Sequence, residues 1–390
     1  MAYIRKKGKG WQYTVNIGID PVTGERKQKA KGGFKTKKEA QIAAAILEQE
    51  IANKTYIPES NKTFEQFVDE WLHMYEHSGK VKISTVRVRK HESDNLKPYF
   101  AKLKLVDITK TMYQNALNDL KTKFAENTLS GIHSTGRMIF KKALEMDLIK
   151  NDPTKFAYVP KSKKTIEEIE QEENKIKYLE KNELAKFLRT AKEDGLPQDY
   201  IIFLLLSYTG MRAGELCALK WKDIDLEEGT INITKTYYNP TNNTMKYQIL
   251  TPKTESSKRS IEIDDTLVKA LEEHKRLQNE LKMRFRKTYY DQDFVITKID
   301  NYPGYPEMIK VIENRMRRLL KKSGLPETLT PHSLRHTHVS LLAEAGVGLQ
   351  EIMDRLGHKD DDVTRNVYWH VTKTRKKEAA QKFAELMNGL

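Results

Sequence analysis

The N-terminal part of the chain begins with stretches in which apolar and polar residues alternate. Such stretches run from Trp11 to Ile19 and from Arg26 to Ala30, and the turn-forming residues Asp20 to Gly24 separate them. An alanine-rich apolar stretch follows, and Thr36 can cap it as a helix together with Glu39, three residues later. This pattern predicts a small sheet followed by one helix.

The second part of the chain repeats its apolar residues at helical spacing. Thr63 and Gln66 have the form of a capping box, which marks the beginning of a helix. The apolar positions that follow recur every three or four residues: Phe64, Phe67, Val68, Trp71, Leu72 and Tyr75. Further helices are predicted over 84–97, 109–121 and 127–146, before Asn151-Asp152-Pro153. We expect a helical domain with the apolar stripe in its core.

Helical and strand-like patterns are mixed in the last part of the chain. A helix is predicted over 181–190, and the apolar stretch YIIFLLLSY follows it. Strand-like alternation then appears in TINITKTYY, MKYQIL and RSIEI, which predicts a small antiparallel sheet. After about Thr266 the pattern is mainly helical again.

These patterns predict an α+β, mainly helical protein of three domains. The first, residues 1–58, has a small three-stranded sheet plus a helix, and the second, residues 59–160, is helical. Residues 161–177 are highly charged and nearly devoid of large apolar side chains, so we expect a linker. The third domain, residues 178–390, is helical with a small antiparallel sheet. The length of 390 residues agrees with this division, since domains average ~100 to 200 residues.

The charge of the chain favours a polyanionic partner. Lys and Arg number 69 against 54 Asp and Glu, a formal charge of +15. No apolar stretch approaches the ~18 residues that a membrane span needs, and no secretory signal follows the basic N-terminus, so we expect a cytoplasmic protein. The single cysteine, Cys217, excludes an internal disulfide and a multi-cysteine metal site; its apolar neighbours indicate a core residue.

Basic residues concentrate in two regions that could contact DNA. Residues 1–38 carry eleven Lys and Arg against two acidic residues, on a predicted sheet that also bears aromatic side chains. A solvated basic face is the alternative explanation. The candidate DNA-contacting residues of the first domain are Arg5, Lys6, Lys7, Tyr13, Arg26, Lys27 and Lys29, and those of the second are Arg87, Arg89, Arg137 and Lys141.

The third domain carries six residues whose order is informative. They are Arg212 in TGMRAGEL, Lys253 in TPKTESSKR, His332 and Arg335 in PHSLRHTH, His358 in LGH, and Tyr368 in NVYWH. In type and order this set resembles the tyrosine recombinases, whose signature is an arginine, a lysine on a β-hairpin, HxxR, a His or Trp in an LGH-like motif, and a nucleophilic tyrosine. The resemblance extends over the whole chain: the first domain resembles the arm-type DNA-binding domain of integrases, and the second their core-binding domain.

The residue types suit phosphodiester cleavage without a metal or another cofactor. Arg212 and Arg335 are planar, permanently charged groups that match the non-bridging oxygens of a phosphorane. His332 lies three residues before Arg335, so both side chains share one helix face. His358 could donate a further hydrogen bond. Tyr368 suits a nucleophile because phenolate is a good leaving group on religation; Lys253 resembles the general acid of the family.

Each of these residues has an ordinary structural explanation when taken singly, and their ordered occurrence carries the prediction. Glu215, three residues after Arg212, is expected either to orient that guanidinium or simply to pack in a helix. His336 and His338 crowd the HxxR motif, but no carboxylate or cysteine at ligand spacing accompanies them, so we interpret them as structural. We expect no metal site.

The sequence therefore predicts an integrase that cleaves and rejoins DNA through a 3′-phosphotyrosine intermediate, integrating and excising a mobile element. A type IB topoisomerase shares this chemistry, but a monomeric relaxing enzyme has no evident use for a second DNA-reading domain. A non-catalytic DNA-binding regulator is the other alternative; all six catalytic-type residues are nevertheless present. A nuclease would need clustered carboxylates, and the motifs contain none.

The resemblance also implies partners. The expected active form is a tetramer on two DNA duplexes, which carry crossover and arm sites, with a directionality factor and a host DNA-bending protein as candidate accessory partners. The C-terminal tail places apolar residues along one helical stripe, suited to docking on a neighbouring protomer or on its own domain: Ala379, Ala380, Phe383, Ala384 and Met387. Phage and integrative conjugative element are equally consistent origins.

Overall fold

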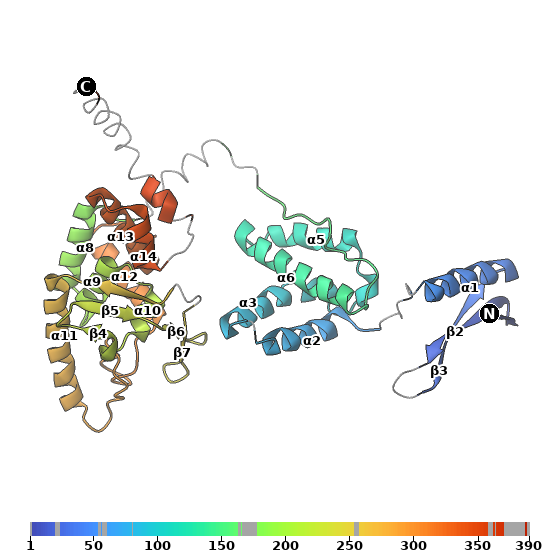
Figure 1. The fold of residues 1–390 in the computed structure, drawn as a ribbon, viewed down its shortest axis with the longest axis horizontal. Coiled ribbons are helices and arrows are strands. Elements are labelled where there is room, and N and C mark those ends of the chain that lie inside the picture. The colour runs from blue at the N-terminus through green and yellow to red at the C-terminus, as the bar shows by residue number, and fades with distance from the viewer. Residues whose placement is uncertain are drawn as a thin grey trace. The chain divides into compact units, whose positions relative to one another are not determined.

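The structure is a computed structural model, and its elements are drawn in chain order in Figure 1. It describes residues 2–19, 24–53, 56, 61–79, 81–162, 165, 178–252, 257–357, 362, 364–369 and 387. The chain divides into two compact units, Met1–Lys164 and Thr165–Leu390. The predicted linker 161–177 and the apolar stripe of the tail lie almost entirely outside the described residues.

The N-terminal residues form an antiparallel sheet with one helix, as predicted. Strands β1 (Tyr3–Lys7), β2 (Gly10–Ile19) and β3 (Arg26–Phe34) are ordered β1-β2-β3. Helix α1 (Lys37–Ala52) begins after Thr36, whose hydroxyl accepts a hydrogen bond from the Glu39 amide. Tyr13 and Val15 of β2 pack on Ala44 and Leu47 of α1, so the sheet buries one face against the helix.

The following residues form a helical domain with its own core. Its elements are α2 (Phe64–His77), α3 (Ile83–Asp94), α4 (Lys97–Phe100), the 3₁₀ helix η1 (Leu105–Asp107), α5 (Lys110–Lys121) and α6 (Glu126–Glu145). The capping box of Thr63 and Gln66 is present at the beginning of α2. Phe64, Phe67, Val68 and Trp71 are buried, which confirms the core stripe.

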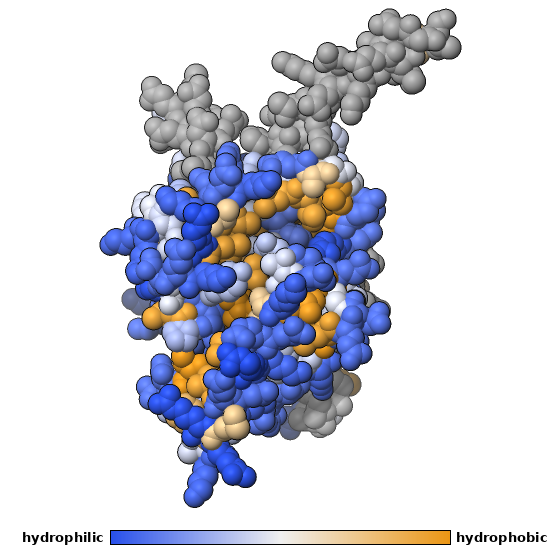
Figure 2. Space-filling model, turned by 90° about the vertical axis from the view of Figure 1, so that its left-hand side faces the viewer, coloured by the Kyte–Doolittle hydropathy of each residue, from blue (hydrophilic) through white to orange (hydrophobic). Residues whose placement is uncertain are grey.

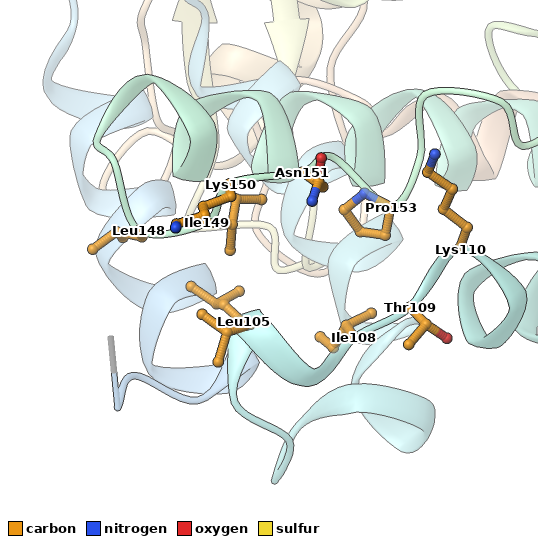
Figure 3. Close-up of a pocket in the computed structure, with 10 residues that line it drawn as sticks. Leu105, Ile108, Thr109, Lys110, Leu148, Ile149, Lys150, Asn151 and Pro153 are labelled. Carbon is orange, nitrogen blue, oxygen red and sulfur yellow. The ribbon is translucent and has the colours of Figure 1, made fainter. Parts of the chain in front are cut away.

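A cavity of about 420 Å³ lies in this helical domain (Figure 3). Its lining comes from the region of η1 and the beginning of α5, including Leu105, Ile108 and Lys110, and from residues 148–153, which follow α6. None of the six candidate catalytic residues is among the described residues that line it. This cavity is therefore not the predicted catalytic site.

The second unit combines helices with two small sheets (Figure 1). It begins with α8 (Lys181–Glu193), α9 (Asp199–Thr209), α10 (Ala213–Ala218) and the 3₁₀ helix η2 (Trp221–Asp223). Strands β4 (Ile224–Asp225), β5 (Thr230–Ile233) and β8 (Arg259–Glu262) form one antiparallel sheet, and β6 (Thr236–Tyr238) and β7 (Gln248–Leu250) form a hairpin. Helices α11 (Asp265–Arg284), α12 (Ile309–Lys322), α13 (Pro331–Ala345) and α14 (Leu349–Leu356) follow.

Helix α9 lies at the centre of this unit, where nearly all of its residues are buried. This explains why YIIFLLLSY is apolar all round, since a helix that is covered on every side has no polar face. The α+β, mainly helical class is confirmed. The prediction of a mainly helical chain after Thr266 holds for α11 to α14, but residues 285–308 between α11 and α12 contain no helix.

The surface is predominantly hydrophilic on the side shown in Figure 2, where hydrophilic side chains separate the apolar patches. In the described part of the chain, no helix combines the length and apolar character needed to cross a membrane. Cys217 is fully buried, and burial raises the pKa of its thiol, as expected of a core residue.

Candidate active site

Arg212 stands at the beginning of α10, and a carboxylate one turn later holds its side chain. Its Nη1 donates to Oε1 of Glu215 at 2.9 Å, and its backbone amide donates to Oε2 at 2.9 Å. The predicted i,i+3 contact is confirmed. The Arg212 side chain is 39% exposed whereas that of Glu215 is 3% exposed, so the buried carboxylate orients a guanidinium that still reaches the surface.

Glu215 has a second partner, Arg259 of β8. Arg259 Nη2 donates to Oε2 at 2.8 Å and Nη1 donates to Oε1 at 3.3 Å. Burial raises the pKa of the Glu215 carboxyl, but hydrogen bonding and charge from Arg259, together with Arg212, outweigh it and the pKa lies below its usual value. The carboxylate therefore stays ionised at neutral pH.

Arg335 lies on α13 and is 2% exposed. Its Nη1 donates to the Gly210 carbonyl at 2.6 Å and its Nη2 donates to the Leu356 carbonyl at 2.7 Å. Gly210 is two residues before Arg212, so Arg335 is hydrogen-bonded to the stretch of chain that leads into Arg212. His332 is exposed in the first turn of the same helix, and its ring meets that of His336 edge to face, with 4.8 Å between ring centroids.

Two arginines hold the C-terminal end of α14. Arg259 Nε donates to the Arg355 carbonyl at 2.9 Å, and Arg335 binds the next carbonyl, that of Leu356. The last carbonyls of a helix carry partial negative charge, which favours cations there. Gly357 then ends the helix with a φ of 69°, in the left-handed region that glycine tolerates. His358, the next residue, lies outside the described residues, as does Lys253.

His338 is a buried member of this arrangement. Its Nε2 accepts a hydrogen bond from Arg355 Nε at 3.2 Å, so the proton of the neutral ring is on Nδ1. The Nδ1–H donates to the Ser207 carbonyl at 2.9 Å. Burial, followed by the charge of Arg355, lowers the pKa of His338 to about 3. The ring is therefore neutral and joins α9, α13 and α14. This agrees with its structural interpretation.

Tyr368 belongs to the helical residues 364–369 and is half-buried. It packs against a hydrophobic cluster that contains Val339 of α13 and Ile352 and Leu356 of α14. Leu356 also supplies the carbonyl that Arg335 binds. Arg335 and Tyr368 therefore both lie where α13 meets α14, and Arg335 also binds the Gly210 carbonyl close to Arg212, although 156 positions separate Arg212 from Tyr368 in the sequence.

The candidate DNA-contacting residues fall into two groups. Most are exposed: Arg5, Lys6, Lys7, Arg26, Lys27, Arg87, Arg137 and Lys141, with Lys29 half-buried. Tyr13 requires a correction, because its ring is 4% exposed and packs beside Phe34 under α1. Arg89 is held by contacts within the helical domain, which was not expected: its Nη1 donates to Glu92 at 2.8 Å and to Thr135 of α6 at 2.9 Å.

No group of three or more His, Cys, Asp or Glu side chains suited to a metal ion occurs in the described part of the chain. The prediction assigned no role to Arg259, which ends the stretch TPKTESSKR, or to Arg355, and both organise the site. No local signal could have shown the role of Arg259, because the partners that connect it to α10 and α14 are 44 and 96 residues away in the sequence.

Comparison with known proteins identifies three matching domain families. Residues 177–375 match the phage integrase family, residues 3–51 an arm DNA-binding domain, and residues 63–121 the N-terminal SAM-like domain of phage integrases. The chain is 31% identical over 362 residues to the integrase of Staphylococcus phage L54a, covering 87% of this chain and 98% of that protein.

Solved structures show the same fold. The Tn1549 transposon integrase in complex with transposon right end DNA is similar with a TM-score of 0.65 at 23% identity, over 82% of this chain and 100% of that one. A lambda integrase tetramer bound to a Holliday junction is similar with a TM-score of 0.56 at 18% identity, over 94% of both chains. The present chain belongs to the phage integrase family and is a tyrosine-type site-specific DNA recombinase.

Proposed function

We propose that this recombinase integrates and excises a mobile element through attack of Tyr368 on DNA. The observation that carries the proposal is that Tyr368 packs against the cluster of α13 and α14, while Arg335 of α13 binds the Gly210 carbonyl, two residues before Arg212. Two guanidiniums and a phenol would supply charge balance and a nucleophile for a phosphodiester.

The proposed reaction assigns each atom a destination. The Tyr368 Oη forms a bond to the scissile phosphorus while the bond to the deoxyribose 5′-oxygen breaks, which leaves a 3′-phosphotyrosine. The phenolic proton passes to His332, and the leaving 5′-oxygen takes a proton from Lys253. Arg212, Arg335 and His358 stabilise the negative charge of the phosphorane. Attack of a 5′-hydroxyl on the phosphotyrosine reverses the step, so this chemistry needs no cofactor.

The other domains have proposed roles as well. We assign residues 1–58 to the arm sites. Residues 59–160 and 178–390 are assigned to the crossover site, and residues 161–177 connect these two domains. The arm-domain match and the exposed basic residues of β1 support the first assignment. Since the similar lambda integrase was solved as a tetramer on a Holliday junction, we propose the same assembly here.

The setting of the reaction is also proposed. We place the protein in the cytoplasm, because the DNA on which a recombinase acts lies there. A directionality factor and a host DNA-bending protein would set the balance between integration and excision. A phage or an integrative conjugative element could carry the gene, and similarity both to a phage integrase and to the ICEBs1 integrase of Bacillus subtilis supports either origin.

The test is the substitution Tyr368→Phe, with Tyr178→Phe as its matched control. Both rings pack against the same hydrophobic cluster, so both substitutions keep the packing and remove one hydroxyl. On a nicked suicide substrate, Tyr368→Phe is expected to form no covalent protein–DNA adduct while its DNA affinity stays within about twofold of the parent. Tyr178→Phe should form the adduct. An adduct with Tyr368→Phe would show that another residue is the nucleophile.

A further inference from the structure

A buried carboxylate in the second unit is shared by two arginines, one of which is not among the six candidate catalytic residues. Glu215 receives Arg212 Nη1 on Oε1 at 2.9 Å, and Arg259 on both oxygens at 2.8 and 3.3 Å. The side chains of Arg259 and Glu215 are 4% and 3% exposed. Removal of either partner from an ion pair this far from solvent would leave a buried charge without a counter-charge, which costs free energy. The Glu215 carboxylate therefore requires cationic partners.

Arg259 also connects the parts of the chain that lead to the other candidate catalytic residues. Its Nε donates to the Arg355 carbonyl at 2.9 Å, three positions before His358, and its Nη1 donates to the Ser257 carbonyl at 3.2 Å. Ser257 directly follows the segment that contains Lys253. One planar guanidinium thus contacts α10, the beginning of β8 and the end of α14, which a lysine ammonium could not span in the same geometry.

We propose that Arg259 is a positioning residue that sets the reach of Arg212 toward the scissile phosphate. Arg259 supplies most of the counter-charge that Glu215 requires. Without it, the buried carboxylate would draw Arg212 inward as its remaining cationic partner, and Arg212 would bind the phosphate less well. This inference rests on the proposed role of Arg212, and Arg259 itself need not touch DNA.

The test compares two suicide substrates with Arg259→Met. One carries the ordinary scissile phosphate, and the other a methylphosphonate, in which a methyl group replaces a charged non-bridging oxygen. The methylphosphonate is neutral, so its cleavage depends less on a positioned guanidinium. Arg259→Met is expected to form the adduct about 100-fold more slowly than the parent on phosphate but within about threefold of the parent on methylphosphonate.

Arg315→Met provides a matched control in the same unit. Asp199 is a fully buried carboxylate that Arg315 and Arg318 share at 3.0 and 2.6 Å, so the substitution removes one of the two arginines of a buried carboxylate. It also removes the contact of Arg315 with Glu307 at 3.5 Å. None of these four residues belongs to the site. Arg315→Met should lower the melting temperature and change the cleavage rate of both substrates by the same factor, which is the signature of a merely structural loss.

Arg259→Lys keeps the charge and decides the matter if Arg259→Met does not fold. A lysine supplies the counter-charge but cannot reproduce the two hydrogen bonds of Arg259 to both Glu215 oxygens, so Arg212 is still drawn inward, though less than in Arg259→Met. A smaller slowing on phosphate, with recovery on methylphosphonate, is therefore expected. Equal slowing on both substrates would overturn the inference. Arg212→Met in the same assay tests the role of Arg212 separately from that of Arg259. If Arg212→Met recovers on methylphosphonate but the Arg259 variants do not, the positioning role of Arg259 is refuted and the role of Arg212 stands. If Arg212→Met does not recover, the proposed role of Arg212 is refuted.

Discussion

The imidazole of His338 shows at the residue scale how burial fixes a protonation state. Its Nε2 accepts from Arg355 and its Nδ1–H donates to Ser207, so a second ring proton would face a guanidinium. Burial and this neighbouring charge lower its pKa to about 3. The unfolded chain has a histidine pKa of about 6.5. Between these values the unfolded state binds a proton that the folded state does not bind.

We therefore predict that this histidine makes the second unit less stable as the pH falls from about 6.5 toward 3. The free energy of unfolding should fall by up to about 1.4 kcal/mol per pH unit from His338 alone, and it gains nothing further above pH 6.5. His338→Gln removes the titrating group, so its unfolding free energy, measured by denaturant at several pH values, should depend less steeply on pH than that of the parent.

His77→Gln serves as the control for this measurement. His77 is exposed on α2 in the other compact unit, so its replacement should leave the pH slope of the second unit unchanged. The buried His274, which contacts the Val295 carbonyl and also has a lowered pKa, contributes a slope of the same sign. If His338→Gln and the parent have parallel pH profiles, the buried ring is not neutral in the folded state.

Residues also show which part of the site a sequence can reveal. The Arg212–Glu215 contact was predictable from the spacing of three residues, and it forms because Glu215, in the first turn of α10, reaches back to Arg212 at the N-cap. The contacts of Glu215 with Arg259 and of Arg335 with Gly210 were not, since they join positions 44 and 125 residues apart. Tyr13 was assigned to the wrong face because an aromatic residue in a basic strand fits either side of a sheet until the position of α1 is known.

At the element scale, the junction between α9 and α10 determines how closely α13 and α14 can approach. Gly210 ends α9 with a φ of 62°, and its carbonyl accepts a hydrogen bond from Arg335. A Cβ built at this position would lie 2.7 Å from Leu356 Cδ2 and 2.8 Å from His338 Cδ2. The leucine methyl can move, but two hydrogen bonds hold the histidine ring.

Gly210→Ala should therefore destabilise the second unit through backbone strain and through overpacking. Left-handed geometry costs an alanine about 1 to 2 kcal/mol and overpacking adds about 1 to 3 kcal/mol. Because the clash falls on the helices that carry Arg335, adduct formation should also slow by about tenfold or more. Chemical denaturation and the suicide-substrate assay measure the two effects.

Gly324→Ala is the matched control for this junction. Gly324 follows α12 with a φ of 63°, but a Cβ there would meet only Lys186 Nζ at 3.9 Å. This substitution carries the backbone strain without the overpacking, and it lies outside the site. It should cost only about 1 to 2 kcal/mol and leave cleavage unchanged. Equal losses of stability in the two variants would contradict the packing argument.

The elements themselves were largely readable because most of their signals are local. The capping residues Thr36 and Thr63, and the apolar periodicity after them, predicted the beginnings of α1 and α2. The irregular residues 285–308 were not anticipated, since tertiary contacts hold them. Gln198, for example, binds both the amide and the carbonyl of Thr297, 99 residues away.

At the scale of the whole molecule, the basic charge is distributed unevenly between the domains. The first 38 residues hold an excess of nine positive charges out of a net +15. Arg5, Lys6 and Lys7 are exposed on β1, and Arg26 and Lys27 are exposed on β3. Every candidate catalytic residue lies at or after Arg212. DNA affinity and strand cleavage should therefore be separable.

We predict that a protein lacking residues 1–55 still forms the tyrosine adduct on a short crossover site but no longer integrates DNA that depends on flanking arm sites. Each phosphate contact contributes about −0.9 to the slope of log affinity against log salt concentration. Binding to full attachment DNA should therefore become less salt-dependent. Replacement of Arg5, Lys6 and Lys7 by Gln in the full-length protein should reproduce part of this change, because it removes three positive charges. The fold should be kept, since these exposed side chains contribute little to the packing of the sheet on α1.

Footprinting on native attachment DNA distinguishes an arm-binding domain from a merely basic one. The full-length protein should protect patches outside the crossover region that the truncated protein leaves open. Identical footprints would rule out arm binding.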